Sequence, residues 1–410
     1  RMPVIAITGT NGKTTTTRML SHIMQHAGRK PGMVCTDGIY VNGQEVEKGD
    51  YCSDTGHLKI LTDRKAEIAV LETHHAGIMF RGFCFDWCEI AVCLNVTEDH
   101  LGVARVESVE QMAAVKQSLI ERARNAAVLN ADDQHCRAML DAVAAEKICL
   151  VSMESSLVDL QKMAGTACYC ILEQIDGAQW LVIHDDGQRL PVMPVAQIPA
   201  TFDGTARFNT SNAMHAVVAA YLAGVEEDMI RTAMATFKNS YQGTPGRLNV
   251  FDDLPFRIVM DFAHNPDGME KLCEFTDQQV VPGRKLVAFS GTVDRADETI
   301  RKMGRVVAGH FDFYFCKEYV YSQGKAPRTT AHLLHQGLLQ AGVAAEKTAV
   351  MGSGRDVIFK IFDACKPGDL LVMLLGHVEK HQLPGYIEEY AGQLARSSNT
   401  GKYEIEGQPR

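Results

Sequence analysis

The stretch Thr8-Gly-Thr-Asn-Gly-Lys-Thr-Thr15 decides the fold of the first part of this 410-residue chain. It follows the apolar run Pro3-Val-Ile-Ala-Ile7, which predicts a strand, and it precedes a pattern typical of a helix. Two glycines let the backbone curl so that successive N–H groups point at one centre, to which the helix N-terminus adds partial positive charge. The lysine can reach the β- and γ-phosphates of a nucleotide, and the threonine after it can bind Mg²⁺. The sequence therefore predicts a site for ATP, formed by Gly9, Thr10, Asn11, Gly12, Lys13, Thr14 and Thr15.

The composition is ordinary for a globular protein, with 46% hydrophobic and 22% charged residues. A formal net charge of −9 argues against binding to nucleic-acid phosphates, because such binding needs a basic surface. No apolar stretch reaches the length of a membrane span, and we expect no signal peptide ahead of the first strand. The 12 cysteines are scattered, which favours reduced thiols over a disulfide framework. We expect a cytoplasmic enzyme that binds neither nucleic acid nor membrane.

Short apolar runs alternate with helical patterns, which predicts parallel sheets with crossover helices. Asp176-Gly177 and Asp186-Gly187 are hairpin signals, so we expect a small antiparallel subsheet in the first half. The turn-rich segment 241–247 separates two domains: a doubly wound, mostly parallel P-loop domain over 1–244 and a Rossmann-like α/β domain over 245–410. The expected strands are 3–8, 32–36, 67–72, 89–95, 126–130, 148–151, 167–172, 180–184, 256–261, 285–290, 311–316 and 370–375. The expected helices are 13–27, 107–124, 132–145, 209–222, 226–236, 267–276, 295–308, 328–341 and 355–363.

Polar residues end several of the predicted strands, where ligands of open parallel sheets gather. Strand 67–72 ends at Glu72, and strand 89–95 runs into a segment that contains His100. With Thr14 on the phosphate loop, these residues form a candidate set of metal ligands: Thr14, Glu72 and His100. We expect Mg²⁺ there, although an imidazole is an unusual ligand for it.

Several segments together resemble the Mur ligase family. The phosphate loop, the Leu71-Glu72 strand end, Asn95-Val-Thr-Glu-Asp-His-Leu101 and Asn130-Ala-Asp-Asp133 are similar to its central domain. Arg207-Phe-Asn-Thr-Ser-Asn212 is similar to a segment with two asparagines near the nucleotide. Pro245-Gly-Arg247 and Asp261-Phe-Ala-His-Asn-Pro266 are similar to the start of its C-terminal domain. Within the superfamily, the C-terminal half of the cyanophycin synthetases is the nearest resemblance, carried by stretches such as Thr36-Asp-Gly-Ile-Tyr40.

The resemblance implies phosphorylation of a carboxylate by ATP, followed by capture of the acyl phosphate by an amine. It implies that Lys13 stabilises the transferring phosphoryl group, that Mg²⁺ binds Thr14 and Glu72, and that His100 holds a second Mg²⁺. Lys116 falls where many members carry a carbamylated lysine; a solvated helix lysine is the alternative. The remaining nucleotide contacts implied by the resemblance are Asn209, Asn212, Arg247, Asp261, His264 and Asn265.

The segment Glu72-Thr-His-His-Ala-Gly-Ile78 departs from the Glu-Thr-Ala-Arg-Gly-Gly-Ile of the cyanophycin synthetases, which bears on substrate specificity. We interpret the neighbouring residues His74 and His75 as substrate-side or structural. We expect a solvated loop at His377, Glu379 and His381.

The favoured function is therefore an ADP-forming amide ligase for a small or peptide-like carboxylate and amine. A P-loop ATPase or phosphotransferase and an inactive nucleotide-binding subunit stay open as alternatives. The two substrates, a homo-oligomer, and an upstream domain or partner chain are also left open by the sequence.

Overall fold

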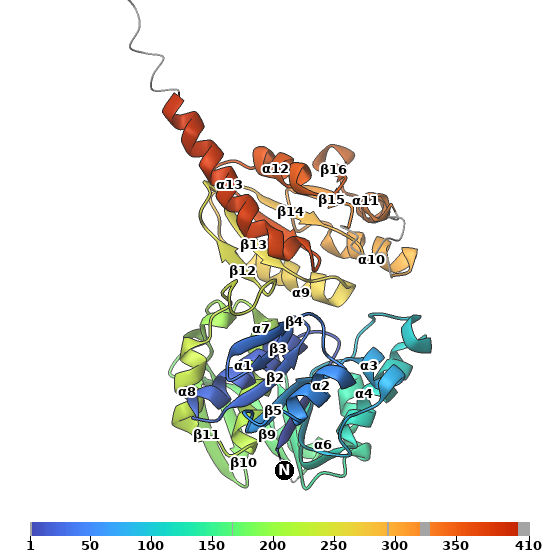
Figure 1. The fold of residues 1–410 in the computed structure, drawn as a ribbon, viewed down its shortest axis with the longest axis vertical. Coiled ribbons are helices and arrows are strands. Elements are labelled where there is room, and N and C mark those ends of the chain that lie inside the picture. Colours follow the sequence, from blue (N-terminus) through green and yellow to red (C-terminus); the bar gives the residue numbers. More distant parts are fainter. Residues whose placement is uncertain (1, 166, 293–294, 320–328, 401–410) are drawn as a thin grey trace, which may run out of the picture. The chain divides into compact units, whose positions relative to one another are not determined.

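The computed structural model describes residues 2–165, 167–292, 295–319 and 329–400. The chain forms two compact units, residues 1–238 and 239–410 (Figure 1). The predicted domain boundary after residue 244 stays a prediction. In the described part of the chain, no helix combines the length and apolar character needed to cross a membrane.

The first unit is built on an 11-stranded sheet of order β11-β10-β9-β8-β7-β6-β1-β5-β2-β3-β4. Its central strands are parallel, as the alternating sequence pattern predicts. The strands are β1 Val4–Thr8, β2 Pro31–Cys35, β3 Gly38–Val41, β4 Gln44–Lys48, β5 Ile68–Glu72, β6 Cys88–Cys93, β7 Ala123–Asn130, β8 Lys147–Ser152, β9 Cys168–Ile175, β10 Ala178–Asp185 and β11 Gln188–Pro194. The helices are α1 Lys13–His26, α2 Asp54–Leu61, α3 His75–Arg81, α4 Val109–Ile120, α5 Gln134–Ala138, α6 Leu157–Met163, α7 Arg207–Leu222 and α8 Glu227–Thr236.

Helices cover both faces of this sheet, which confirms the doubly wound fold. Successive residues of β1 point to opposite faces: Ile5 and Ile7 join an apolar cluster with α1, α7 and α8, whereas Val4 and Ala6 join a second cluster with α4. Because both faces are buried, β1 reads as a continuous apolar run instead of an alternating one.

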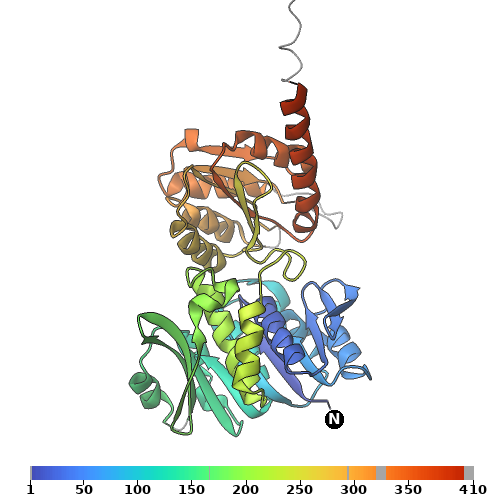
Figure 2. The same cartoon turned by 90° about the vertical axis from the view of Figure 1, so that its left-hand side faces the viewer.

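Antiparallel strands flank the parallel core at both edges. The predicted subsheet is confirmed as β9, β10 and β11, and it continues the main sheet because β8 and β9 pair in parallel. These green strands project at one side of the first unit (Figure 2). Asp176-Gly177 and Asp186-Gly187 adopt the positive φ angles that hairpin turns of this kind require.

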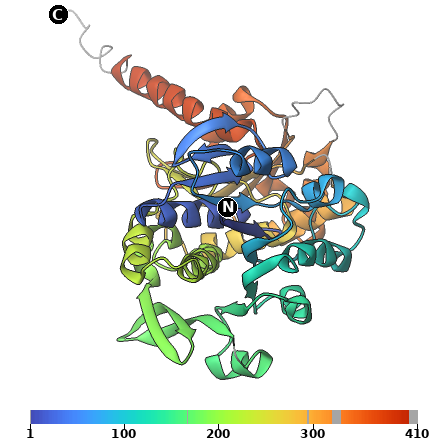
Figure 3. The same cartoon turned by 60° about the horizontal axis from the view of Figure 1, so that its bottom comes forward.

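The opposite edge carries a hairpin that we did not predict, β3 and β4, drawn in blue well away from the green strands (Figure 3). Helices α2 and α3 were also not predicted. The expected helix 132–145 is replaced by the much shorter α5 and a single 3₁₀ turn, Leu140–Ala142.

The second unit holds a six-stranded sheet of order β12-β13-β17-β14-β15-β16, parallel except for β12. Its strands are β12 Asn249–Phe251, β13 Arg257–Asp261, β14 Lys285–Phe289, β15 Phe313–Lys317, β16 Thr348–Met351 and β17 Leu370–Leu374. Its helices are α9 Pro266–Asp277, α10 Asp297–Val307, α11 Thr330–Gln340, α12 Arg355–Ala364 and α13 Glu379–Thr400. This arrangement confirms the predicted second α/β domain.

The expected solvated loop after β17 is confirmed at His377, which is exposed in a turn; His381 is also exposed but lies in α13. The expectation is wrong for Glu379. Glu379 begins α13 and is 3% exposed, and both of its carboxylate oxygens accept hydrogen bonds from the buried Nζ of Lys317, at 2.8 and 2.6 Å. The burial of Glu379 reflects its ion pair with Lys317, which comes from a distant strand and which the local sequence pattern could not reveal.

Candidate nucleotide and metal site

The phosphate loop of residues 9–12 joins the carboxyl end of β1 to α1, where the sequence predicts it. Gly12 precedes α1 with φ of 87°, in the left-handed region that favours glycine. A Cβ atom at Gly12 would lie 2.2 Å from Oδ1 of Asn212 on α7. The loop can therefore approach α7 only because this position has no side chain.

Asn95, which follows β6, holds the loop in shape. Its Oδ1 accepts hydrogen bonds from the backbone N of Thr10 at 3.1 Å and of Asn11 at 2.8 Å, and its Nδ2 donates to the carbonyl of Asn11 at 3.1 Å. The Thr10 hydroxyl accepts from the backbone N of Thr97 at 3.0 Å. We did not predict Asn95 as a site residue, although its place at a strand end beside the loop was a usable signal.

Two lysines donate to carbonyl groups of the same loop. Lys13 Nζ donates to the carbonyl oxygens of Gly9 at 2.9 Å and Thr10 at 2.8 Å, and Lys116 Nζ donates to that of Gly9 at 2.9 Å. The amine that the resemblance assigns to the phosphates thus lies directly at the loop, together with a second amine from α4.

Lys116 is buried, with 2% of its surface exposed, so the interpretation as a solvated helix lysine is wrong. Burial, reinforced by the positive charge of Lys13, lowers the pKa of Lys116 to about 7. A substantial fraction of this side chain is therefore an uncharged amine at neutral pH.

Glu72 ends β5 and is 1% exposed. Its Oε2 accepts a hydrogen bond from the Thr14 hydroxyl at 2.9 Å and from the backbone N of Thr36 at 3.2 Å. Its Oε1 accepts from the Thr36 hydroxyl at 2.9 Å. His57 Nε2 donates to the carbonyl of Glu72 at 2.8 Å, since a carbonyl can only accept. Thr36 and His57 were not predicted as site residues.

The oxygen atoms of Thr14 and Glu72 fit a magnesium ion, which prefers hydroxyl and carboxylate oxygens and keeps several water ligands. The hydroxyl of Thr36, which lies 3.4 Å from that of Thr14, adds a further oxygen to the set. His100 is a different kind of ligand, and its Nε2 lies 3.8 Å from Oδ2 of Asp99. The structure therefore groups two of the three predicted metal ligands by direct hydrogen bonding.

His100 contacts two other histidines of the first unit. Its ring centroid lies 5.4 Å from that of His74 and 5.5 Å from that of His75, and the last two are 4.3 Å apart. Burial, reinforced by Lys116, His100 and Lys13, lowers the pKa of His75 to about 3. Burial and Lys13 likewise hold the pKa of His74 well below its usual value. These two imidazoles are neutral at physiological pH.

The two asparagines predicted from the resemblance lie on α7 and are buried. Asn212 Nδ2 donates to Oδ1 of Asn209 at 3.2 Å, and Asn209 Nδ2 donates to the carbonyl of Ala200 at 2.8 Å. Because Oδ1 of Asn212 lies next to Gly12, this pair supports the helix side of the phosphate loop. The first unit thus brings together the loop, Glu72, Lys116 and both asparagines.

The remaining predicted residues lie in the second unit, around the carboxyl end of β13. Asp261 accepts hydrogen bonds from the backbone N of Leu248 at 2.9 Å and of Ala263 at 2.8 Å, while burial raises its pKa. The Arg247 guanidinium lies over the ring of Phe262, 5.0 Å from the centroid. His264 Nδ1 donates to the carbonyl of Phe262 at 2.8 Å.

Asn265, also predicted to meet the nucleotide, caps α9. Its Oδ1 accepts from the backbone N of Gly268 at 2.8 Å, the hydrogen bond expected of an N-cap residue. The second unit thus groups Arg247, Asp261, His264 and Asn265 at one end of its sheet.

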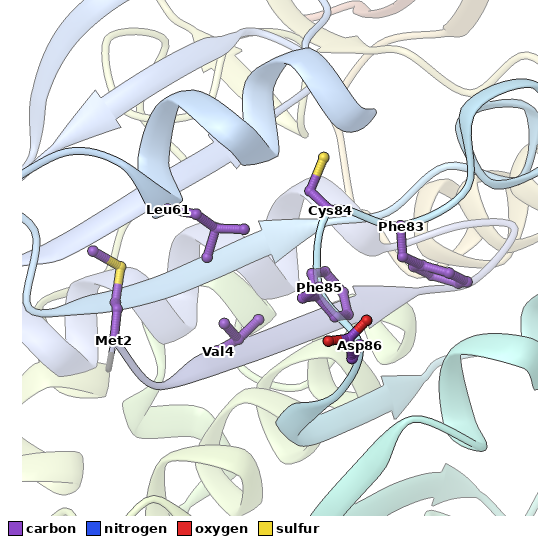
Figure 4. A pocket seen from close by; sticks show the side chains of 7 residues that line it. All are labelled: Met2, Val4, Leu61, Phe83, Cys84, Phe85 and Asp86. Carbon is purple, nitrogen blue, oxygen red and sulfur yellow. The ribbon is translucent and has the colours of Figure 1, made fainter.

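A pocket of about 390 Å³ lies elsewhere in the first unit (Figure 4). It is lined by Met2 and Val4 at the start of β1 and by Leu61, Phe83, Cys84, Phe85 and Asp86. Because the phosphate loop follows the other end of β1, this pocket is separate from the candidate site.

Comparison with known proteins identifies the family. Residues 7–220 match the family model of the Mur ligase middle domain, and residues 246–376 match that of the Mur ligase, glutamate ligase domain. Cyanophycin synthetase of Synechocystis sp. is 36% identical over 354 residues, which cover 86% of this chain and 40% of that protein. A UDP-N-acetylmuramoyl-L-alanyl-D-glutamate–2,6-diaminopimelate ligase of Clostridium botulinum is 26% identical over 93% of this chain and 74% of its own length.

Among solved structures, E. coli FolC in complex with DHPP and ADP superimposes with a TM-score of 0.69 at 20% identity, covering 93% of this chain and 88% of that one. This likeness concerns the fold. The chain spans less than half the length of the cyanophycin synthetases that it matches. With family models matched across both of its units, the chain belongs to the Mur ligase family.

Proposed function

We propose that this protein is an ATP-dependent, ADP-forming ligase that joins a carboxylate to an amine through an acyl phosphate. The observation that carries the proposal is the hydrogen bond from Thr14 to the buried carboxylate of Glu72, directly beside the Lys13 loop, in a chain of the Mur ligase family. The alternatives are a P-loop ATPase or phosphotransferase and an inactive nucleotide-binding subunit.

The reaction has two balanced steps. An oxygen of the acceptor carboxylate attacks the γ-phosphorus of ATP, and the bond to the β-phosphate oxygen breaks to release ADP. The amine then attacks the carbonyl carbon of the acyl phosphate; inorganic phosphate leaves, and the nitrogen loses a proton to form the amide. Both substrates are small molecules or peptide-like, as in the relatives.

The residues of the first unit supply the charges that the first step needs. Lys13 exchanges its loop carbonyl partners for phosphate oxygens and stabilises charge on the transferring group. Thr14 and Glu72 would hold Mg²⁺, with His100 as a ligand of a second ion; bound Mg²⁺ neutralises the charge that develops on the phosphates. Lys116, as an uncharged amine, is the form that reacts with carbon dioxide, which supports the carbamylated lysine that the resemblance implies.

The nucleotide contacts of the second unit are carried over from the resemblance. Arg247 is assigned to the phosphates, Asp261 to the ribose, and His264 and Asn265 to the adjoining part of the nucleotide. The conservative variant Asp261→Asn keeps the shape of the side chain and is expected to raise the KM for ATP without unfolding the protein. Unchanged ATP kinetics would remove Asp261 from the site.

We also propose a cytoplasmic location, where ATP is available. All 12 cysteines are unpaired, including Cys93 and Cys136, whose sulfur atoms lie 3.5 Å apart. Free thiols in such proximity are typical of a reducing compartment. We also propose that the protein forms a homo-oligomer or works with an upstream domain or a partner chain. Measuring the mass of the native protein tests this part of the proposal.

The proposed function is tested by ADP release in the presence of Mg²⁺ with candidate carboxylates and amines, each omitted in turn. A ligase requires both; an ATPase requires neither; an inactive subunit releases no ADP. Lys13→Ala is expected to abolish turnover while circular dichroism shows an intact fold, because the loop keeps its Asn95 and Thr97 contacts. Turnover retained in Lys13→Ala would contradict the role assigned to this lysine.

A further inference from the structure

The C-terminal half of α1 carries two histidines, His22 and His26, on one face of the helix. Their ring centroids are 4.2 Å apart. Because α1 begins at Lys13 and a helix rises about 1.5 Å per residue, His26 lies about 20 Å along the helix from the phosphate loop. This pair of imidazoles is therefore separate from the candidate nucleotide and metal site.

The hydroxyl of Thr236, the last residue of α8, lies close to both rings. Its Oγ1 is 3.0 Å from Nε2 of His22 and 3.5 Å from Nε2 of His26. The carbonyl oxygen of Ala233, in the last turn of α8, lies 3.0 Å from the same Nε2 of His22. Two imidazole nitrogens and two oxygens thus converge where α1 and α8 end.

His26 is held in the tautomer that a metal ligand needs. Its Nδ1 donates to the backbone carbonyl of His22 at 3.0 Å, since a carbonyl can only accept. In the neutral ring this leaves the lone pair on Nε2, the atom that lies near Thr236. Metal-binding histidines in proteins typically donate their other N–H to a carbonyl or a carboxylate in this way.

His22 is oriented by contacts with α8 and the residue after it. Its ring lies edge-to-face against Phe237, with centroids 5.5 Å apart. Burial, reinforced by His26, lowers the pKa of His22, so this ring is neutral at pH 7. Its Nε2 carries the proton that is donated to the carbonyl of Ala233. The other neutral tautomer, with the proton on Nδ1, frees Nε2 to bind a metal ion without any net release of a proton.

The donor atoms and the helix ends decide the kind of ligand. Carbonyl groups at a helix C-terminus carry partial negative charge, so the ends of α1 and α8 both favour a cation. Imidazole nitrogens suit Zn²⁺, Cu²⁺ and Ni²⁺, whereas Mg²⁺ prefers oxygen ligands. His26 and Thr236 are exposed, so an ion can reach the site from solvent.

We propose that His22 and His26 bind a divalent transition-metal ion, for which Zn²⁺ is the probe, and that the hydroxyl of Thr236 supplies an oxygen ligand from α8. Such an ion links the end of α1 to the end of α8 and stabilises the first unit. The proposal goes beyond the proposed function and does not depend on it, because these three residues take no part in the candidate nucleotide site.

The experiment measures Zn²⁺ binding to the full chain by titration calorimetry, in excess Mg²⁺ and without nucleotide. His26→Gln, at an exposed position, is expected to weaken this binding at least tenfold, because even partners that only orient a metal ligand contribute tenfold or more. Thr236→Val keeps the shape of the side chain and is expected to weaken it about tenfold. The matched control is His332→Gln, which removes an exposed histidine on α11 and is expected to leave the affinity unchanged.

Thermal unfolding gives a second readout. Zn²⁺ is expected to raise the melting temperature of the wild type and of His332→Gln more than that of His26→Gln, because an ion that binds the folded chain stabilises it. An equal rise in all three proteins would place the ion elsewhere and contradict the proposal.

The proposal is overturned if the wild type binds no Zn²⁺ in excess Mg²⁺, or if folded His26→Gln binds Zn²⁺ as the wild type does. The second result is also the one expected if Zn²⁺ were held by thiols or by the site at Thr14 and Glu72. Unchanged binding in Thr236→Val would confine the ion to α1 and contradict the link to α8.

Discussion

Lys116 Nζ donates a hydrogen bond of 2.9 Å to the carbonyl oxygen of Gly9, although 107 residues separate the two in the chain. This contact fixes α4 to the phosphate loop through a buried amine. It also places Lys116 beside Lys13, which donates to the same carbonyl. The lowered pKa of Lys116, about 7, follows from this burial and this neighbour.

The buried amine predicts a pH dependence of stability. Between the pKa of about 7 in the folded chain and the ordinary value of 10.5 for an exposed lysine, the unfolded chain binds more protons at this position. Raising the pH through this interval therefore increases the free energy of unfolding of the wild type relative to Lys116→Met. Urea unfolding of both proteins at about pH 6 and about pH 9 measures the difference. A constant difference would show that Lys116 titrates as an exposed lysine.

The same amine predicts a covalent product with carbon dioxide. An uncharged Nζ attacks the carbon of CO₂, the nitrogen loses a proton, and a carbamate anion forms. ¹³C NMR of the protein equilibrated with ¹³C-bicarbonate at about pH 8, where the amine is mostly deprotonated, is expected to show one carbamate signal. The signal should be missing from Lys116→Met. If the wild type shows no carbamate signal, Lys116 remains an amine whose role is limited to its hydrogen bond to the phosphate loop.

The hydrogen bonds from Thr36 to Glu72 predict that replacing Thr36 affects metal binding. Thr36→Val removes the hydroxyl that donates to Oε1 of Glu72 while its backbone N still donates to Oε2. Partners that orient a metal-binding carboxylate typically contribute tenfold or more in affinity, so we expect Mn²⁺ binding, measured by electron paramagnetic resonance with an ATP analogue, to weaken about tenfold. Thr36→Ser keeps the hydroxyl and is expected to bind as the wild type does. Equal affinity in Thr36→Val would mean that Glu72 needs no such support.

Replacing Gly12 by alanine is predicted to lower both the stability of the protein and its affinity for nucleotide. An alanine there would adopt an unfavourable φ and place its Cβ 2.2 Å from Oδ1 of Asn212. Gly28→Ala is the matched control, because Gly28 has a similar φ of 75° but no described atom within 4 Å of an added Cβ. We expect Gly28→Ala to lose about 1 kcal/mol of unfolding free energy and to bind nucleotide normally. Gly12→Ala should lose more and bind nucleotide poorly; equal behaviour of the two variants would show that the contact with Asn212 is unimportant.

Much of the fold was predictable because its signals are local. The apolar run of β1, the glycines of the loop and the start of α1 at Lys13 follow one another in sequence, and their structure depends on that order. Glu72 was predictable as a strand end, since the parallel pairing of β1 with β5 brings it to the edge that carries the loop.

Other features depend on contacts that sequence patterns do not encode. The burial of Lys116 and its bond to Gly9 arise only when α4 packs beside the loop, so helix periodicity could not reveal them. Thr36 contacts Glu72 because β2 and β5 are neighbours in the sheet, which no local signal fixes. The hairpin of β3 and β4 was missed because β4 is mostly exposed and lacks an apolar alternation. The Asn42-Gly43 pair, whose positive φ angles form its turn, was a signal that could have located it.

The central claim is that the site around Lys13, Thr14 and Glu72 phosphorylates a carboxylate. It is tested most directly by supplying the acceptor that supports ADP release with ¹⁸O in its carboxylate and analysing the inorganic phosphate by mass spectrometry. Transfer through an acyl phosphate leaves one carboxylate oxygen on the phosphorus, so the account predicts phosphate that carries a single ¹⁸O atom. Phosphate without the label would show that water attacks the γ-phosphate directly, and would contradict the ligase mechanism.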